Sequence, residues 1–310
     1  NMRVLTNMKV AAAFPTDHRL HASPPANRFP PETQEMLAEA DVILSLDWLD
    51  LGGLLKNAYG SKPVTAKVIQ VSCDQHNHRG WSADHQGLPP IDVYLLCEPE
   101  AAVPMLLDAT KARTASVPDK TVVKAPSSSG DAVSMSGVAH ALLAATKGSD
   151  VCYTHLPIGW SGAYSHLNHP LDYLGAEGGA GVGSGPGIAV GAALALKGSG
   201  RLPIGVLGDG DFLMANTAIW TAAHYKIPTL IVVCNNRSFF NDELHQERVA
   251  KERGRPPENR WIGMRIGDPD IDLAGLARAQ GAVGIGPVTR PADLQSAIDK
   301  GIETVRNDPR

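Results

Sequence analysis

The 310-residue sequence has few cysteines and little net charge, and it has no long apolar run. Its four cysteines, Cys73, Cys97, Cys152 and Cys234, form no CxxC pair. We therefore expect buried free thiols in a reducing compartment rather than disulfides or a metal site. The formal net charge of −4 gives no electrostatic reason to propose nucleic acid or a membrane as a partner. No stretch approaches the roughly 20 apolar residues that span a bilayer, and no signal core follows the N-terminus. These absences predict a soluble cytoplasmic protein.

The sequence has enough apolar residues for a large core and is organised in three parts. Hydrophobic residues make up 43% of the chain, and its length suits one large or two ordinary domains. Residues 1–110 alternate helix-like and strand-like segments. Residues 111–130 are rich in Pro, Ser and Lys, which is typical of a linker. Residues 131–310 alternate more regularly, and we expect them to form a second domain.

The order of the expected elements predicts an α/β fold. In the first part we expect a helix at 32–40 and strands at Val42–Leu46 and Lys67–Val71. In the second part we expect a helix capped by Asp131 and running to about Thr146, strands at 151–154, 203–207 and 229–234, and helices at 188–197, 212–225, 272–280 and 291–306. Such alternation implies right-handed crossovers and doubly wound parallel sheets, with ligands beyond the carboxyl ends of the strands.

The stretch from 208 to 236 is the most informative part of the second domain. The sequence GDG ends one apolar run at Gly208, and a double asparagine ends the next run at Asn236, with a helix-length segment between them. This spacing places Asp209 and Asn236 at the ends of two strands. A carboxylate and an amide oxygen suit Mg²⁺, which prefers oxygen ligands completed by phosphate and water. Gly208 and Gly210 allow a sharp turn and a close approach to phosphate, and the helix beginning near Phe212 directs its positive end there.

The GDG-to-NN stretch resembles the diphosphate-binding signature of thiamine-diphosphate enzymes. The words IWTAAHYKIPTLIVVCNN at 219–236 are most similar to the acetohydroxyacid synthase and benzoylformate decarboxylase branch. This resemblance implies thiamine diphosphate and Mg²⁺ as cofactors. The implied metal ligands are the side chains of Asp209 and Asn236 and the backbone carbonyl of Ser238. The implied diphosphate contacts are Gly208, Gly210 and the backbone N–H of Asp211.

Two further features of this resemblance concern side chains near the cofactor. The family often has serine at the position of Asp211, and a second carboxylate beside a diphosphate is unfavourable unless it turns away or pairs. No side-chain role is therefore assigned to Asp211. The passage GGAGVGSGPGIAVGAA at 178–193 resembles the family's glycine run, in which Val182 aligns with the apolar residue that holds thiamine bent. Residues 154–159 align with another loop on the diphosphate side.

The resemblance also implies protein beyond this sequence. Residues 1–110 resemble the second half of the family's central domain, where some members carry flavin or a nucleotide, but no clean phosphate loop is present; Gly52 and Gly53 alone are too little. The pyrimidine-binding domain, whose glutamate activates the ring, does not precede Asn1. We therefore expect it from another chain or from a longer form of this one, with a slight preference for a fragment. The family builds its sites in dimers or tetramers.

The resemblance implies a lyase, or a transferase of carboligase type, that acts on a 2-oxo acid. The segment 237–263 flanks the substrate in relatives. Phe239 and Phe240 are candidates for a pocket wall, and Glu243 or His245 for proton transfer, although a solvated helix with ion pairs is the simpler interpretation. The same applies to a set of loop histidines, His155, His166 and His169. A non-catalytic cofactor-binding subunit and a nucleotide-binding Rossmann module remain as alternatives.

Overall fold

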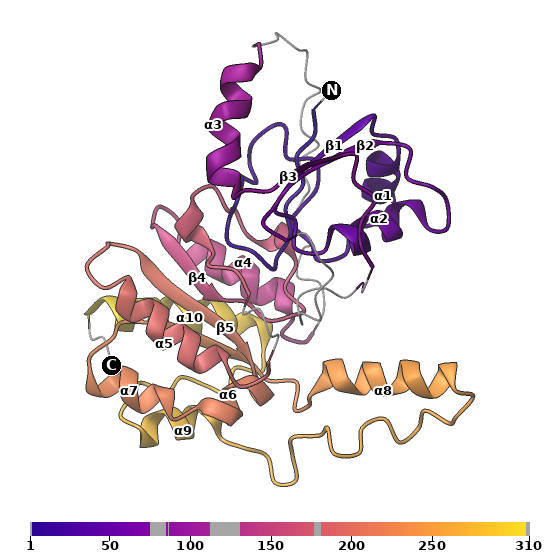
Figure 1. Cartoon of the computed structure of the whole chain (residues 1–310). Coiled ribbons are helices and arrows are strands. Elements are labelled where there is room, and N and C mark those ends of the chain that lie inside the picture. The colour runs from indigo at the N-terminus through magenta and orange to yellow at the C-terminus, as the bar shows by residue number, and fades with distance from the viewer. Residues whose placement is uncertain (1, 75–84, 86, 112–130, 177–180, 308–310) are drawn as a thin grey trace. The chain divides into compact units, whose positions relative to one another are not determined.

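The computed structural model of the chain describes residues 2–74, 85, 87–111, 131–176 and 181–307. The chain divides into two compact units, each built on a three-stranded parallel sheet with helices (Figure 1). The first unit comprises Asn1–Lys9, Thr16–Val122 and Glu177–Ala180, and the second comprises Val10–Pro15, Val123–Ala176 and Gly181–Arg310. The α/β fold with parallel sheets is confirmed.

The predicted domain limits stay a prediction. All of the linker at 111–130 except Lys111 lies outside the described residues. The short segment Val10–Pro15 belongs with the second unit, where the Ala12 N–H donates to the Tyr173 carbonyl at 3.1 Å. The predicted division into 1–110 and 131–310 places this segment in the first domain, because its sequence carries no pattern that assigns it to either domain.

The first unit has the sheet order β1-β2-β3, with strands β1 (Val42–Leu46), β2 (Lys67–Val71) and β3 (Val93–Leu95). Its helices are α1 (Pro31–Ala38), α2 (Leu51–Tyr59) and α3 (Pro99–Ala109). Apolar residues of the strands and of α1 and α2 form one core: Leu37, Ile43, Leu51, Leu55, Tyr59, Ala66 and Val68. Alternate residues of β1 face the core or solvent, since Ile43 is buried while Val42 and Leu44 are exposed.

Three elements of the first unit were missed by the sequence analysis. Helix α2 begins with a pair of glycines, Gly52 and Gly53, in place of a strong helix signal. The Asp50 side chain caps it by accepting from the Gly53 N–H at 2.9 Å. Strand β3 has only three residues, and α3 contains Pro104 in its interior. None of these three elements has the periodic apolar pattern from which a helix or strand can be predicted.

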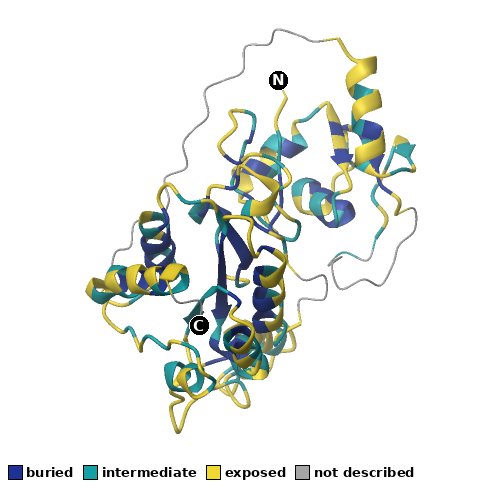
Figure 2. Ribbon diagram, turned by 90° about the vertical axis from the view of Figure 1, so that its left-hand side faces the viewer, coloured by how far each residue is buried: buried dark blue, intermediate teal, exposed yellow. Residues whose placement is uncertain are grey.

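The second unit has the sheet order β4-β5-β6, with strands β4 (Val151–His155), β5 (Leu202–Gly208) and β6 (Leu230–Cys234). Its helices are α4 (Met135–Ala145), α5 (Gly185–Ala195), α6 (Asp209–Ala215), α7 (Ala218–His224), α8 (Phe240–Glu252), α9 (Leu273–Ala279) and α10 (Pro291–Asn307), with short 3-10 turns η1 (Gly162–Tyr164) and η2 (Pro170–Asp172). Every residue of β5 before Gly208 is buried, as expected for a central parallel strand (Figure 2).

The packing of the second unit explains its sequence pattern. Helices α5 and α7 share a small-residue core with Val190, Ala193 and Ala222. Phe212 of α6 and Leu207 of β5 are buried in a second cluster. Within the described residues, no helix is both long enough and apolar enough to span a bilayer.

Three predicted helix boundaries in the second unit are wrong. Ser134, not Asp131, caps α4, because its side chain accepts from the Gly137 N–H at 3.1 Å. The single helix expected at 212–225 is two helices, separated at Asn216 and Thr217. Helix α5 begins at Gly185 rather than at 188, with a proline in its first turn.

The four cysteines are free but not all buried, which corrects the expectation of buried thiols. Cys152 is buried and Cys73 is exposed. Burial raises the pKa of the Cys152 thiol to about 11, and burial likewise raises the pKa of Cys234 to about 11.

Thiol labelling should follow this order. In the native protein at pH 8, iodoacetamide is expected to modify Cys73 first, because it is exposed, although desolvation and Glu98 raise the pKa of its thiol. Cys152 and Cys234 should stay unmodified, because burial shields them and keeps both thiols protonated. Peptide mass spectrometry after a short reaction measures this, and guanidinium-denatured protein is the control in which all four thiols react. Native labelling of Cys152 ahead of Cys73 would contradict the expectation.

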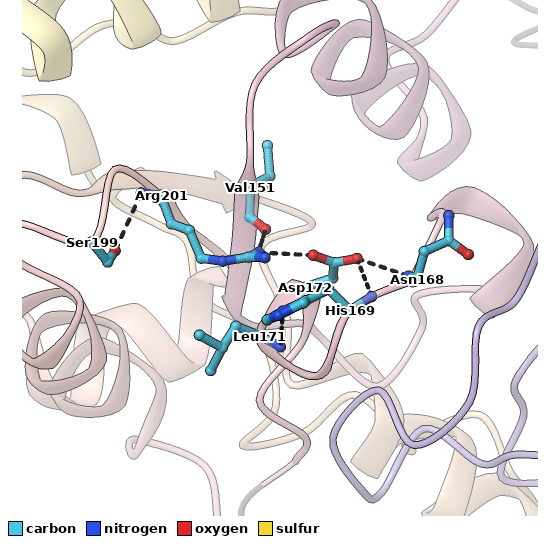
Figure 3. A network of polar contacts seen from close by, with 7 residues as sticks. All are labelled: Val151, Asn168, His169, Leu171, Asp172, Ser199 and Arg201. Atoms are coloured by element: carbon cyan, nitrogen blue, oxygen red, sulfur yellow. Dashed lines mark hydrogen bonds and ion pairs between the residues drawn. The ribbon is translucent and has the colours of Figure 1, made fainter.

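A polar network lies at the amino end of the second sheet (Figure 3). Arg201 donates through Nη1 to the Val151 carbonyl at 2.9 Å and to Asp172 Oδ1 at 2.8 Å. The other oxygen of Asp172 accepts from the backbone N–H groups of Asn168 and His169 at 2.7 and 2.8 Å. The two charged side chains are only 12% and 19% exposed. This network ties the 168–172 loop to the sheet.

Candidate functional site at the carboxyl edge of the second sheet

The two polar motifs meet at the carboxyl edge of neighbouring strands. Strands β5 and β6 are parallel, and their last paired residues are Gly208 and Cys234. Asp209 follows the first directly, and Asn236 follows the second by two positions. Because paired strands lie about 4.8 Å apart, this register brings the motifs to one place, although they are far apart in the sequence.

Asp209 is the most constrained of the predicted site residues. It is 2% exposed, and its Oδ2 atom has no hydrogen-bond partner within the described part of the chain. Burial raises the pKa of the Asp209 carboxyl, although the backbone N–H groups of Gly210, Arg237 and Ser238 act in the opposite direction. A buried carboxylate oxygen without a donor carries a desolvation cost, and a bound cation would remove that cost.

The segment after β6 presents oxygens towards the same edge. Asn236 is exposed, and its Oδ1 atom accepts from the Ser238 N–H at 3.0 Å. Ser238 forms an antiparallel bridge with Arg265. The hydrogen bonds of this bridge use the Arg237 carbonyl and the Phe239 N–H, so the Ser238 carbonyl takes no part in it.

The two glycines of GDG serve different purposes, and one expectation about them is wrong. Gly208 has φ −78° and ψ 159°, a conformation that any residue adopts, so no sharp turn requires glycine there. A Cβ at Gly208 would meet no atom within 4 Å, which leaves space for a ligand. A Cβ at Gly210 would lie 2.3 Å from the Phe239 ring, so Gly210 is needed for packing. Helix α6 begins at Asp209, earlier than the expected start near Phe212.

The Asp211 side chain binds the backbone of the glycine turn before α5. Its Oδ1 atom accepts from the Gly183 N–H at 2.7 Å and from the Gly185 N–H at 3.1 Å. The carboxylate is thus paired with two backbone donors. Val182, on the same glycine turn, is 45% exposed, and residues 178–180 of the run lie outside the described residues.

The donor set fits a hard cation with an anionic ligand. The described residues contain no group of three His, Cys, Asp or Glu side chains that could hold a metal ion. The candidate set instead has one carboxylate, one amide oxygen and one carbonyl, from Asp209, Asn236 and Ser238. Such a set leaves positions for phosphate and water, as Mg²⁺ prefers. Their role as ligands stays a prediction.

Among the candidate pocket residues of the segment 237–263, one is buried beside the motif and two others are exposed. Glu243 is buried and accepts a hydrogen bond from the Ser238 hydroxyl, so a solvated helix is the wrong description for this residue. The rest of α8 fits that description, since Lys251 pairs with Glu247, and His245 is exposed. Phe240 is 48% exposed. Helix α8 extends away from the sheet (Figure 1).

Among the loop histidines, His155 has a contact that the sequence analysis did not assign to the site. It ends β4, is buried, and lies with Nε2 3.8 Å from Asp211 Oδ2. No sequence pattern links the two residues, because only the sheet brings them together. His169 accepts from the Leu171 N–H at 3.0 Å and so caps a turn.

The first unit offers little support for a flavin or nucleotide at α2. The Gly53 N–H is used by Asp50, and a Cβ at Gly52 would lie 2.6 Å from the Gly87 carbonyl oxygen. The helix start therefore faces a carboxylate and a carbonyl, both of which disfavour phosphate. This agrees with the absence of a phosphate loop in the sequence.

The fold and this edge define a parallel α/β domain with oxygen donors at the ends of adjacent strands. Residues 157–307 match the family described as thiamine pyrophosphate enzyme, C-terminal TPP binding domain. The chain is 28% identical over 166 residues to acetolactate synthase isozyme 3 large subunit of Escherichia coli K12, which covers 52% of this chain and 27% of that protein. It is 29% identical over 126 residues to benzoylformate decarboxylase of Pseudomonas aeruginosa, which covers 41% and 22%.

A solved structure agrees with these matches. The thiamine diphosphate-dependent 4-hydroxybenzoylformate decarboxylase of Rhodococcus jostii RHA1 superimposes with a TM-score of 0.60 at 26% identity, over 79% of this chain and 43% of that one. The chain thus contains, at residues 157–307, the C-terminal cofactor-binding domain of the thiamine-diphosphate-dependent enzymes, and the relatives that it matches are of the acetolactate synthase and benzoylformate decarboxylase branch. It spans well under two thirds of the length of each relative.

Proposed function

We propose that this chain is the diphosphate-binding part of a thiamine-diphosphate- and Mg²⁺-dependent lyase or carboligase that acts on a 2-oxo acid. The buried Asp209 carboxylate carries this proposal, since its Oδ2 atom lacks a partner within the described residues at an edge where further oxygen donors meet. Membership of the family supports thiamine diphosphate as the ligand. The names of the relatives support a 2-oxo acid such as benzoylformate as the substrate.

Each site residue has a distinct task in this proposal. Asp209 and Asn236 hold the cation with their side chains, and Ser238 holds it with its carbonyl. The backbone at Gly208, Gly210 and Asp211 receives the diphosphate. Val182 supports the thiamine ring from the glycine turn, which its exposure permits. When bound, the cofactor supplies an electron sink for loss of CO₂.

The rest of the active site comes from other protein in this proposal. A pyrimidine-binding domain supplies the glutamate that activates the ring, either from a second chain or from a longer form of this one. Residues 1–110 are then part of a central domain, joined by 111–130 to the diphosphate domain at 131–310. Dimers or tetramers bring the two halves of each site together.

Isothermal titration calorimetry tests the cofactor assignment. We expect thiamine diphosphate to bind with Mg²⁺ and to bind far more weakly with EDTA, while NAD gives no heat. Binding of NAD without binding of thiamine diphosphate would instead indicate a nucleotide-binding module. Release of CO₂ from benzoylformate or 4-hydroxybenzoylformate, with a supplied pyrimidine-binding domain, tests catalysis. Binding without any turnover would favour a non-catalytic subunit.

A further inference from the structure

The side chain of Asp211 is seated against the backbone of the glycine turn. Its Oδ1 atom accepts two backbone N–H groups, from Gly183 at 2.7 Å and Gly185 at 3.1 Å. A Cβ on Gly185 would lie 2.0 Å from Asp211 Oδ2, so the carboxylate occupies the space of a side chain there. Gly183 has φ +100°, which favours glycine. The turn and the first residue of α5 are thereby fixed to the start of α6.

His155 lies on the other side of the same carboxylate. Its Nδ1 atom lies 3.1 Å from the Val206 carbonyl oxygen. Because a carbonyl can only accept, Nδ1 must carry the proton and donate. This fixes the ring with Nε2 directed at Asp211 Oδ2, 3.8 Å away, and the two side chains are 9% and 14% exposed. The carboxylate therefore accepts hydrogen bonds from the glycine turn and lies beside the end of β4.

We propose that Asp211 is a positioning residue whose carboxylate latches the glycine turn 181–185 onto the start of α6, with His155 of β4 packed beside the carboxylate. The latch fixes the turn that carries Val182 before any ligand binds. A serine, which is common at this position in the family, has a single oxygen one bond beyond Cβ. It cannot both accept the two N–H groups and face His155 as Asp211 does. The latch itself needs only the contacts above, while its effect on the cofactor rests on the proposed function.

Amide hydrogen exchange in the whole chain tests the latch without any ligand. In Asp211→Ala, we expect the Gly183 and Gly185 amides to exchange at least about tenfold faster, since two hydrogen bonds to a charged acceptor are lost. Asp211→Asn should stay close to the wild type, because one amide oxygen at the Oδ1 position can accept both N–H groups.

Asp172→Ala is a matched control at the opposite end of the sheet. Asp172 also accepts two backbone N–H groups and contacts a basic side chain. Its removal should leave the exchange of Gly183 and Gly185 unchanged relative to the amides of β5. Equal acceleration of all amides in Asp211→Ala, or no acceleration at the turn, would overturn the latch.

Binding of pyrophosphate with Mg²⁺ separates the latch from the proposed function. We expect the dissociation constant to rise about tenfold in Asp211→Ala through loss of preorganisation and to be restored in Asp211→Asn. If the wild type binds no pyrophosphate, the proposed function fails, and the exchange rates alone decide the latch. If Asp211→Ala exchanges faster yet binds like the wild type, the claim that the latch prepares the turn for the cofactor is overturned.

Discussion

Replacing Asp209 by asparagine is expected to abolish Mg²⁺-dependent binding of thiamine diphosphate and to stabilise the metal-free protein. The carboxylate is the only charged ligand in the candidate set, and the loss of a residue that merely supports a metal ligand already weakens binding about 10- to 100-fold. We therefore expect the dissociation constant to rise by at least about 100-fold. In the metal-free protein, the Oδ2 atom has no donor within the described residues. A neutral amide should raise the free energy of unfolding by about 1 kcal/mol.

The stability difference should depend on pH in a defined direction. Burial raises the pKa of Asp209 in the folded protein above its value in the unfolded chain. The folded state then binds the proton more tightly, so this residue contributes stability at pH values below its unfolded pKa. That contribution is lost as the pH rises through the folded pKa. The free energy of unfolding of Asp209→Asn should therefore exceed that of the wild type most at neutral pH. In acid the two free energies should become equal.

Two measurements and one control variant decide the Asp209 prediction. Calorimetry with thiamine diphosphate and Mg²⁺ gives affinity, and thermal unfolding with EDTA gives stability at pH 4.5 and 7.5. Asp293→Asn is the control, because Asp293 forms an exposed pair with Arg290 and lies in no candidate site. It should bind like the wild type. An Asp209→Asn protein that keeps Mg²⁺-dependent binding would remove Asp209 from the metal site.

The sequence predicts that the two motifs lie at one edge of the sheet, but it does not predict the contacts of the side chains there. GDG and NN each end an apolar run, and in a parallel sheet such ends share one edge. The pairing of Gly208 with Cys234 shows the geometry behind that prediction. The contact of Asp211 with His155 has no such signal, because it depends on which way a side chain turns and on residues 56 positions apart in the numbering. The role of Gly210 was also missed, since it depends on the distant Phe239 ring.

Helices and strands with a strong local apolar pattern could be predicted from the sequence, and the others could not. Strand β5 is a nearly continuous apolar run and β2 has three apolar residues in five, and both were placed within two residues. Elements that depend on packing were missed or misplaced. Helix α2 relies on the Asp50 cap and on core contacts of Leu51 and Leu55 to offset its two glycines. The break between α6 and α7 comes where Asn216 bonds back to the Leu213 carbonyl at 2.9 Å, which single-residue propensity does not reveal.

Replacing Arg201 by methionine should cause a larger loss of stability than any exposed ion pair in the chain. Arg201 is 12% exposed, and Asp172 would be left with two backbone donors but no cation. Leaving one partner of a mostly buried pair costs about 2–4 kcal/mol. For a unit of this size, that loss lowers the melting temperature by about 4–16 °C. The Val151 carbonyl also loses a donor at the start of β4, so the 168–172 loop should become sensitive to proteases (Figure 3).

A matched pair elsewhere in the chain distinguishes burial from charge in this prediction. Arg290 and Asp293 form a bidentate pair with side chains 75% and 47% exposed. Arg290→Met should leave the melting temperature unchanged, because solvent screens an exposed pair. The double variant Arg201→Met/Asp172→Leu should recover part of the loss, since no uncompensated charge then remains. Equal effects of the two arginine replacements would show that burial does not set the strength of the Arg201 network.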